Sequence, residues 1–385
     1  MLEDLEMDFV AIDLGASNTR YVSTDRMVGF LSNRMAITDD IDRYIPLESY
    51  DAVPENNLDV TIIKEGESKF FPVRAIIGSL TDRCDMAVET PSQMSLKVDQ
   101  RINYISTIMA AALSKLKNVP LGDTLNLFVA LPPAEVVSHR DRFKQELVGK
   151  YTVRFNKLGT DGTTIKFTIN NVACYEESRM ALMQFFFDPR YPDRQKKYTG
   201  CDILSIDIGA STTDLVVFKN NRFLDKTGRT FKIGCNLARD YIIRTISESE
   251  GMDLPFEIAD RCLAEGRLKQ GNAYVDIGDI VDNAKKAVAK EITIKMDQYF
   301  TSIGIPIKTI NYIVVSGGGS MESSYVDEET GNVIKTSAPM SVYLTDALKE
   351  ISAGTEIVYY GDEPRLANIN GLGTLAFARK GEIKE

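Results

Sequence analysis

An eight-residue segment occurs twice in the chain, and its residue types suit the binding of phosphate. The segment Ile-Asp-Leu-Gly-Ala-Ser-Asn-Thr at 12–19 recurs as Ile-Asp-Ile-Gly-Ala-Ser-Thr-Thr at 206–213, with six of the eight positions identical. Glycine lets a ligand approach the backbone closely, and small neighbours leave successive amide groups open to an anion. The aspartate supplies the hard oxygen ligand that Mg²⁺ prefers, usually through water. The repeat therefore predicts two turns that grip one polyphosphate, and it disfavours the alternative of two unrelated hairpin turns.

Three further segments have the composition of a nucleotide site. Ser316–Ser320 is a glycine-rich turn that follows a short apolar run, and Gly234–Leu237 opens a predicted helix whose amide groups can meet an anion. Tyr175–Ser178 places Glu176 and Glu177 between a predicted strand and a predicted helix. Taken singly, these segments are explained by a flexible turn, an asparagine N-cap and acidic residues at a helix N-terminus. Together with the repeat they favour a nucleotide site.

The elements that must position these segments alternate between strands and helices, which is the pattern of an α/β protein. Strands are predicted at 9–13, 19–23, 60–64, 70–73, 125–130, 166–172, 203–207, 213–218 and 312–316. Helices are predicted at 101–117, 177–187, 237–249 and 277–300, and from about residue 372. Residues 24–100 are otherwise rich in loops. The polar segment at 188–197 contains two prolines, so we expect a domain junction there.

Composition excludes several classes of protein. The 385 residues are 44% hydrophobic and 26% charged, which is ordinary for a globular chain and enough for about two to three domains. A net charge of −10 without a run of lysine and arginine disfavours direct binding of nucleic acid or an anionic membrane. The acidic N-terminal segment is unlike a secretory signal, and the apolar stretches are far shorter than a membrane span. Five scattered cysteines and the single His139 offer no disulfide framework or metal site, so we expect a cytoplasmic protein.

In their order along the chain, these segments resemble the motifs of the actin superfamily, which includes sugar kinases, heat-shock ATPase domains and actins. The matches are Asp13–Arg20 with phosphate-1, Val172–Ser178 with connect-1, Asp207–Asp214 with phosphate-2, Gly234–Leu237 with the G-x-[DN]-[LF] helix start, Val315–Ser320 with the adenosine motif and 366–373 with connect-2. Within the superfamily the chain most resembles the bacterial plasmid-segregation ATPases of the ParM type. That resemblance rests on Glu177-Ser178, on the compact length and on Ala367–Gly371.

The resemblance implies an α/β, actin-like two-domain fold, in which duplicated ribonuclease-H-like domains flank a nucleotide cleft. Domain I would comprise residues 1–190, including a variable insert at about 24–100 that matches no motif. A C-terminal helix at about 372–385 would pack back on it. Domain II would comprise residues 198–371.

The resemblance also implies roles for single residues. Asp13 and Asp207 would hold Mg²⁺ through its water shell, and with Glu177, which would orient the attacking water, they form the implied catalytic set. Glu176 stays the alternative to Glu177, because the motif also aligns with a shift of one residue. Arg20 stands where actins carry a lysine that contacts phosphate. The residues implied to bind nucleotide are Asp13, Gly15, Ala16, Ser17, Asn18, Thr19, Arg20, Gly209, Ala210, Ser211, Thr212, Thr213, Gly234, Asn236, Gly317, Gly318, Gly319 and Ser320.

The implied activity is hydrolysis of ATP with Mg²⁺ as cofactor, coupled to the growth and loss of filaments. GTP stays open, because the adenosine motif contains no side chain identified as reading the base. The expected partners are further copies of the chain and a DNA-binding adaptor of the ParR type, which would segregate plasmid DNA without direct contact between this chain and DNA or membrane. A cell-shape or archaeal-type actin is one alternative. A small-molecule kinase is another, although we find no motif for its general base.

Overall fold

The structure is a computed structural model that describes residues 8–45, 57–92, 95–117, 121–157, 162–349, 351–352, 354–360 and 363–382. The chain divides into two compact units: unit 1 is Met1–Gln184 with Asn368–Glu385, and unit 2 is Phe185–Ala367. The first division falls inside helix α3 (Glu177–Phe187), and the second follows the first residue of helix α9 (Ala367–Glu382). Each unit combines a sheet with helices, as the sequence predicts.

Unit 1 is built on a ten-stranded sheet with the order β3-β2-β1-β8-β10-β9-β5-β6-β4-β7. Its strands are β1 (Asp8–Leu14), β2 (Asn18–Val22), β3 (Val28–Ser32), β4 (Met35–Thr38), β5 (Asn57–Lys64), β6 (Val73–Gly78), β7 (Val88–Glu89), β8 (Thr124–Leu131), β9 (Gly149–Phe155) and β10 (Thr163–Glu176). The pairs β1–β8 and β8–β10 are parallel, and the other pairs are antiparallel.

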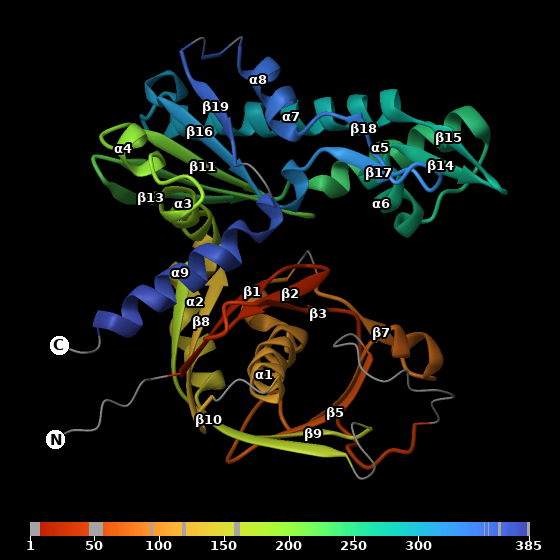
Figure 1. The fold of residues 1–385 in the computed structure, drawn as a ribbon, viewed down its shortest axis with the longest axis vertical. Helices are drawn as coiled ribbons and strands as arrows, with labels where there is room; N and C mark the ends of the chain where they lie inside the picture. The colour runs from red at the N-terminus through yellow and green to blue at the C-terminus, as the bar shows by residue number, and fades with distance from the viewer. Residues whose placement is uncertain are drawn as a thin grey trace. The chain divides into compact units, whose positions relative to one another are not determined.

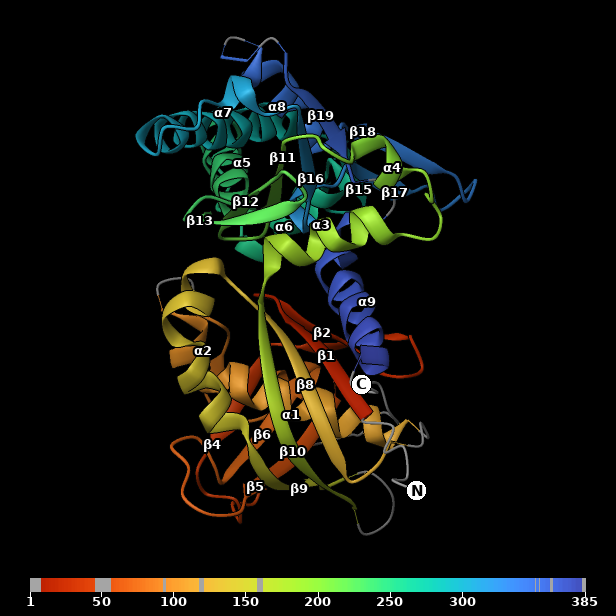
Figure 2. The ribbon, with the colours of Figure 1, turned by 90° about the vertical axis from the view of Figure 1, so that its left-hand side faces the viewer.

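Helices cover both faces of the central strand β1. The sheet curves around α1 (Arg101–Leu116), as Figure 1 shows, and α1 is buried along almost its whole length. Val10, Ile12 and Leu14 belong to the core on the α1 side. On the opposite face α9 runs beside β1 (Figure 2), where the rings of Phe9 and Phe377 meet edge to face at 4.9 Å. The strand that ends at Asp13 and Leu14 is therefore fixed from both sides. The remaining helices of unit 1 are α2 (Pro133–Leu147), η1 (Ser79–Arg83) and η2 (Lys97–Asp99).

Unit 2 is built on a five-stranded sheet with the order β13-β12-β11-β16-β19. Its strands are β11 (Ile203–Ile208), β12 (Thr213–Lys219), β13 (Arg222–Phe231), β16 (Tyr312–Ser316) and β19 (Glu356–Tyr359). Two separate hairpins are formed by β14 (Arg267–Gln270) with β15 (Ala273–Asp276), and by β17 (Ser323–Val326) with β18 (Val333–Ser337). The helices are α4 (Arg194–Tyr198), α5 (Cys235–Glu250), α6 (Phe256–Glu265), α7 (Gly278–Ser302), α8 (Met340–Leu348), η3 (Ile307–Thr309), η4 (Gly318–Ser320) and η5 (Pro364–Leu366).

The two sheets repeat one arrangement of strands. In unit 2 the order β13-β12-β11-β16-β19 has two antiparallel pairs followed by two parallel pairs. The order β3-β2-β1-β8-β10 in unit 1 has the same directions. The duplicated turns thus follow equivalent strands, β1 and β11, in equivalent sheets. This is the duplicated two-domain architecture that the resemblance implies, while the limits 1–190 and 198–371 stay a prediction.

Most of the predicted elements are present, and the differences have local causes. The strand predicted at 70–73 is wrong: the ladder begins only at Val73, since Pro72 has no amide hydrogen to donate. The final helix begins at Ala367 rather than near 372. Helix α2 was not predicted, because Pro132 and Pro133 indicate a break; Pro133 instead occupies the first turn of the helix, where no amide hydrogen is needed. The described parts of the predicted loop-rich region, 24–45, 57–92 and 95–100, carry five strands of the unit 1 sheet.

Candidate functional site

The first turn lies in unit 1 between β1 and β2. Asp13 is 4% exposed and stands opposite Arg20 in the antiparallel pair. Arg20 Nη1 lies 3.1 Å from Asp13 Oδ2, so the carboxylate has a cationic neighbour. Ser17 is exposed at the tip of the turn, and Gly15, Ala16 and Asn18 are partly exposed. The turn thus offers small residues to the solvent and keeps its charged pair at its base.

Asn33, which lies outside all the motifs, fixes the conformation of this turn. Its Nδ2 donates to Gly15 O at 2.6 Å, and its backbone amide donates to Ser17 O at 2.9 Å. Its Oδ1 accepts hydrogen bonds from the hydroxyls of Thr19 at 2.9 Å and Ser106 at 2.7 Å. Because Thr19 is fully buried in this network, its hydroxyl holds the turn rather than facing a ligand. No motif in the sequence marks Asn33.

Lys97 connects Glu177, the first residue of α3, with the base of this turn. Its Nζ lies 2.5 Å from Glu177 Oε1 and 2.5 Å from Leu14 O, the last carbonyl of β1. Glu176 is equally buried, but its Oε2 accepts from Arg179 Nε at 2.7 Å. The structure therefore brings Glu177 toward the turn and gives Glu176 a partner within α3. Lys97 lies in the region that matches no motif, so the sequence held no signal for it.

The second turn lies in unit 2 between β11 and β12. Asp207 is 6% exposed and stands opposite Asp214, which accepts a hydrogen bond from Thr230 Oγ1. Gly209 N donates to Thr212 O at 2.8 Å and closes the turn. The hydroxyl of Thr213 is buried like that of Thr19 and donates to Ile233 O at 2.7 Å. The two turns therefore differ in charge, since an aspartate stands where unit 1 has Arg20.

The start of α5 packs directly on this second turn. The backbone amides of Cys235 and Asn236 donate to Gly209 O at 3.1 Å and to Ala210 O at 2.7 Å. Asn236 Nδ2 donates to Ser211 Oγ at 3.3 Å. These two amides are occupied by the turn, so the expectation that they are free to meet an anion is wrong. Gly234 and Asn236 instead join α5 to the turn.

The glycine-rich segment after β16 also reaches the second turn. Gly317 has a φ of +90°, and a Cβ atom there would lie 2.4 Å from Asp207 Oδ1. A side chain is therefore excluded by both the backbone conformation and the contact. Ser316 Oγ lies 3.4 Å from Asp207 Oδ1, and Ser320 Oγ donates to Gly317 O at 2.8 Å. The segment that contains Gly318 and Gly319 thus stands beside the aspartate that ends β11.

The structure gathers the predicted residues into two groups, one in each unit. In unit 1 the group is Asp13, Gly15, Ala16, Ser17, Asn18, Thr19, Arg20 and Glu177, joined by Asn33 and Lys97. In unit 2 the group is Asp207, Gly209, Ala210, Ser211, Thr212, Thr213, Gly234, Asn236, Gly317, Gly318, Gly319 and Ser320. Each group lies at the ends of equivalent strands.

The oxygen ligands that the two groups offer fit Mg²⁺ that is held mainly by water and phosphate. Within the described parts of the chain, no set of three or more His, Cys, Asp or Glu residues is arranged to hold a metal ion. Asp13 and Asp207 are buried carboxylates at the ends of β1 and β11, and Asp214 adds a third opposite Asp207. Mg²⁺ characteristically keeps several waters and takes one or two carboxylates together with substrate phosphates. The residues present match that mode of binding rather than an all-protein cage.

A buried lysine lies next to the unit 2 group. Lys285 of α7 is 3% exposed, and its Nζ donates to Met321 O at 3.2 Å and to Ala338 O at 2.9 Å. Burial disfavours the ammonium form and lowers the pKa of Lys285 to about 8, although nearby Cys235, Asp282 and Glu322 act in the opposite direction. Burial also raises the pKa of the Cys235 thiol, which stays protonated at neutral pH.

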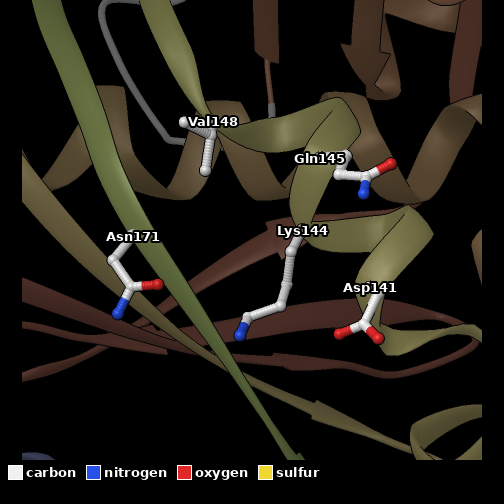
Figure 3. Close-up of a pocket in the computed structure, with 5 residues that line it drawn as sticks. All are labelled: Asp141, Lys144, Gln145, Val148 and Asn171. Carbon is white, nitrogen blue, oxygen red and sulfur yellow. The ribbon is translucent and has the colours of Figure 1, made fainter.

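An open hollow on unit 1 involves neither group. Figure 3 shows the five residues that line it: Asp141, Lys144, Gln145 and Val148, on or next to α2, and Asn171 on β10. None of them was predicted as a site residue. The hollow is open, and its lining contains no residue of the duplicated turns. The candidate site is therefore the two groups at the strand ends.

Comparisons with known proteins support the fold. Residues 205–324, which contain the second turn, the start of α5 and the glycine-rich segment, match the family model of the archaeal actin homologue MreB-like protein, C-terminal part. No curated protein matches the sequence. Among solved structures, the 15-stranded ParM filament from Clostridium botulinum is 20% identical, with a TM-score of 0.65 over 97% of this chain and 99% of that chain.

Two further solved structures are similar over the same extent. The actin-like protein Alp7A is 17% identical, with a TM-score of 0.68 over 98% of this chain and 97% of that chain. The archaeal actin homologue Ta0583, in its complex with ADP, is 16% identical, with a TM-score of 0.62 over 97% of this chain and the whole of that chain. The protein thus has the two-domain α/β fold of the actin superfamily. It is similar in structure to ParM, Alp7A and the archaeal actin homologue. Among the residues described, no helix is both long and apolar enough to cross a bilayer.

Proposed function

We propose that this protein is an actin-like ATPase that binds Mg·ATP, hydrolyses it and assembles into filaments that segregate plasmid DNA. The observation that carries the proposal is the duplicated turn, which follows the equivalent strands β1 and β11 in two sheets of the same strand order. Two copies of the aspartate, the glycine and the small residues after it, at equivalent strand ends, support a site for phosphate. Both turns would hold the phosphates of the same nucleotide.

The chain's own residues suit phosphoryl transfer to water. Asp13 and Asp207 would hold Mg²⁺ through water, and the bound ion would neutralise charge on the phosphates. Arg20 adds a cation beside Asp13, and the small turn residues admit the phosphates to the backbone. Glu177 would accept a hydrogen bond from the attacking water, since Lys97 holds its carboxylate near the end of β1. Phosphoryl transfer depends mainly on such positioning and charge neutralisation.

The same arrangement would couple assembly into filaments to the bound nucleotide. The similar ParM from Clostridium botulinum, which is solved as a filament, supports assembly, and Ta0583, which is solved with ADP, supports nucleotide binding. A γ-phosphate held by both turns would favour one conformation of the chain. If subunit contacts favour that conformation too, hydrolysis would weaken the filament by the difference in binding energy. The net charge of −10 suits contact with DNA through an adaptor of the ParR type rather than directly.

The test is 90° light scattering of the purified protein after addition of Mg·ATP, with phosphate release followed in parallel. We expect scattering to rise with ATP and to decay as phosphate appears. Asp207→Ala should abolish Mg²⁺-dependent hydrolysis, whereas Asp123→Ala, at a 96% exposed side chain, should hydrolyse ATP as the wild type does. Near-normal turnover of Asp207→Ala would contradict the site. Hydrolysis with flat scattering at tens of micromolar protein would favour a kinase or a chaperone-like protein.

The same assay distinguishes the roles of Glu177 and Glu176 in hydrolysis. Glu177→Gln should keep nucleotide binding and assembly but slow phosphate release by about 100-fold or more. Glu176→Gln is the matched control, because Glu176 is equally buried but pairs with Arg179. If Glu176→Gln has the slow phenotype and Glu177→Gln does not, the motif is aligned one residue out of register.

A further inference from the structure

Lys97 belongs to no motif, yet its side chain joins three segments of unit 1. It opens η2, the short helix before α1, and its Nζ contacts both the last carbonyl of β1 and the first residue of α3. The side chain of Lys97 is 22% exposed and that of Glu177 only 8%. The ion pair is thus largely shielded from water, where its attraction exceeds that of an exposed pair.

The backbone around Lys97 is itself held by a buried carboxylate. Glu135, in the first turn of α2, is 5% exposed and accepts from the amides of Lys97 and Val98, each at 3.0 Å. Asn103 Nδ2 donates to Lys97 O at 3.0 Å, and Tyr104 OH donates to Val98 O at 2.9 Å. These contacts come from two helices and fix the backbone that carries the ammonium group. The lysine is therefore placed by the fold and is not a mobile surface side chain.

The contacts of Lys97 restrict what the Glu177 carboxylate can do. A glutamate at the start of a helix has several rotamers, some of which turn the carboxylate away from the strand end. The bond from Lys97 Nζ to Oε1, made by an ammonium that also bonds Leu14 O, keeps the carboxylate next to the turn that follows β1. A displacement of about 1 Å in such a group can cost about 100-fold in rate.

We propose that Lys97 is a positioning residue for nucleotide hydrolysis, which fixes the Glu177 carboxylate beside the turn that follows β1. The inference rests on the proposed function and adds to it a residue outside all the sequence motifs. Lys97 acts through Glu177 and does not bind the nucleotide. Its loss therefore lowers the rate of hydrolysis and leaves nucleotide affinity unchanged.

The experiment is a double-mutant cycle of Lys97→Met and Glu177→Gln, with kcat, KM and the Kd of a fluorescent ATP analogue measured for each variant. Lys97→Met should lower kcat by about 10- to 100-fold, with KM and Kd within about twofold of the wild type. In the Glu177→Gln background it should cause no further loss of kcat, because the group through which it acts is already gone. Lys97→Arg, which keeps the charge, should restore part of kcat.

Lys115→Met is the matched control. The Nζ of Lys115 also bonds backbone carbonyls, those of Leu121 and Gly122, and a carboxylate, that of Asp123, but it touches no site residue. It should leave kcat unchanged even where it lowers the melting temperature. If Lys97→Met fails to fold, as judged by circular dichroism, Lys97→Gln replaces it, because the amide can still donate to Leu14 O without the charge.

The outcomes separate this inference from the proposed function. If the wild type does not hydrolyse ATP, the proposed function is wrong and the inference falls with it. If the wild type is active but Lys97→Met keeps its kcat, only the inference is wrong. A Kd raised tenfold at unchanged kcat would make Lys97 a phosphate ligand instead. If Lys97→Met lowered kcat equally in the wild-type and Glu177→Gln backgrounds, Lys97 would act independently of Glu177.

Discussion

At the scale of single residues, the burial of Lys285 predicts how the stability of the protein depends on pH. Its ammonium is enclosed by α7, the segment after η4 and the segment before α8, and two backbone carbonyls are its hydrogen-bond acceptors. Burial lowers its pKa from 10.5 to about 8. Below pH 8 both the folded and the unfolded chain carry the proton, so the cost of burying the charge is present in full. Between about pH 8 and 10.5 only the unfolded chain keeps the proton, and stability should rise with pH.

We therefore expect the free energy of unfolding of the wild type, relative to Lys285→Met, to increase by about 3 kcal/mol from pH 7.5 to pH 10.5. Urea unfolding followed by circular dichroism measures both proteins at each pH, and the tyrosines that titrate in this range cancel in the comparison. Lys335→Met, at a 69% exposed side chain, is the control and should show no such trend. A constant difference between wild type and Lys285→Met would show that the lysine is not desolvated.

At the scale of elements, the two helices that contain the unit divisions cross within unit 1 at one glycine. A Cβ atom on Gly371 of α9 would lie 1.8 Å from Met180 O and 2.6 Å from Met180 C, in the backbone of α3. Thr374 Oγ1 donates to Gln184 Oε1 at 3.0 Å one turn further along. The helices can approach this closely only because position 371 has no side chain, so the glycine sets the distance between α3 and α9.

Gly371→Ala should lower the free energy of unfolding by about 3 kcal/mol, because a backbone atom cannot move aside as a side chain can. Alanine favours helices over glycine, and this effect offsets the loss by only about 1 kcal/mol. Chemical denaturation gives the value directly. Gly354→Ala, where no heavy atom lies within 4 Å of the added carbon, is the control and should be close to neutral. A stabilised Gly371→Ala would mean that α3 and α9 do not cross at this distance.

The sequence predicts some elements of the fold and the site but not others. Helices α1 and α7 were predicted because their apolar stripe repeats over many turns, and the strands around both turns because their runs are apolar and bounded by glycine. Asn33 and Lys97 were missed because they act through contacts with residues 18 and 80 positions away, which no local pattern encodes. Of the strands from β3 to β7, β5 pairs with distant β9, and β6, β4 and β7 follow β5 in the order of the sheet. Such pairing leaves no periodic signal of its own.

At the scale of the whole molecule, each unit has its own hydrophobic core among the residues described. The core of unit 1 runs from Val10 to Val172, and the core of unit 2 runs from Leu204 to Leu348. A segment that buries its own core tends to unfold as its own cooperative unit. Calorimetry of the nucleotide-free protein should therefore resolve two transitions. One of the duplicated turns would be lost with each transition.

Bound nucleotide should merge the two unfolding transitions into one if both turns hold it. Mg·ADP avoids turnover during the scan, and a ligand at 100 times its Kd stabilises the folded state that binds it by about 2.7 kcal/mol. Because unfolding either unit would release the ligand, both transitions should move upward and merge. Asp13→Ala and Asp207→Ala should each remove the merging, although each substitution lies in only one unit. If Mg·ADP raised the melting temperature of unit 2 alone and Asp13→Ala made no difference, the nucleotide would be held by the second turn only. The coupling between hydrolysis and assembly would then need another origin.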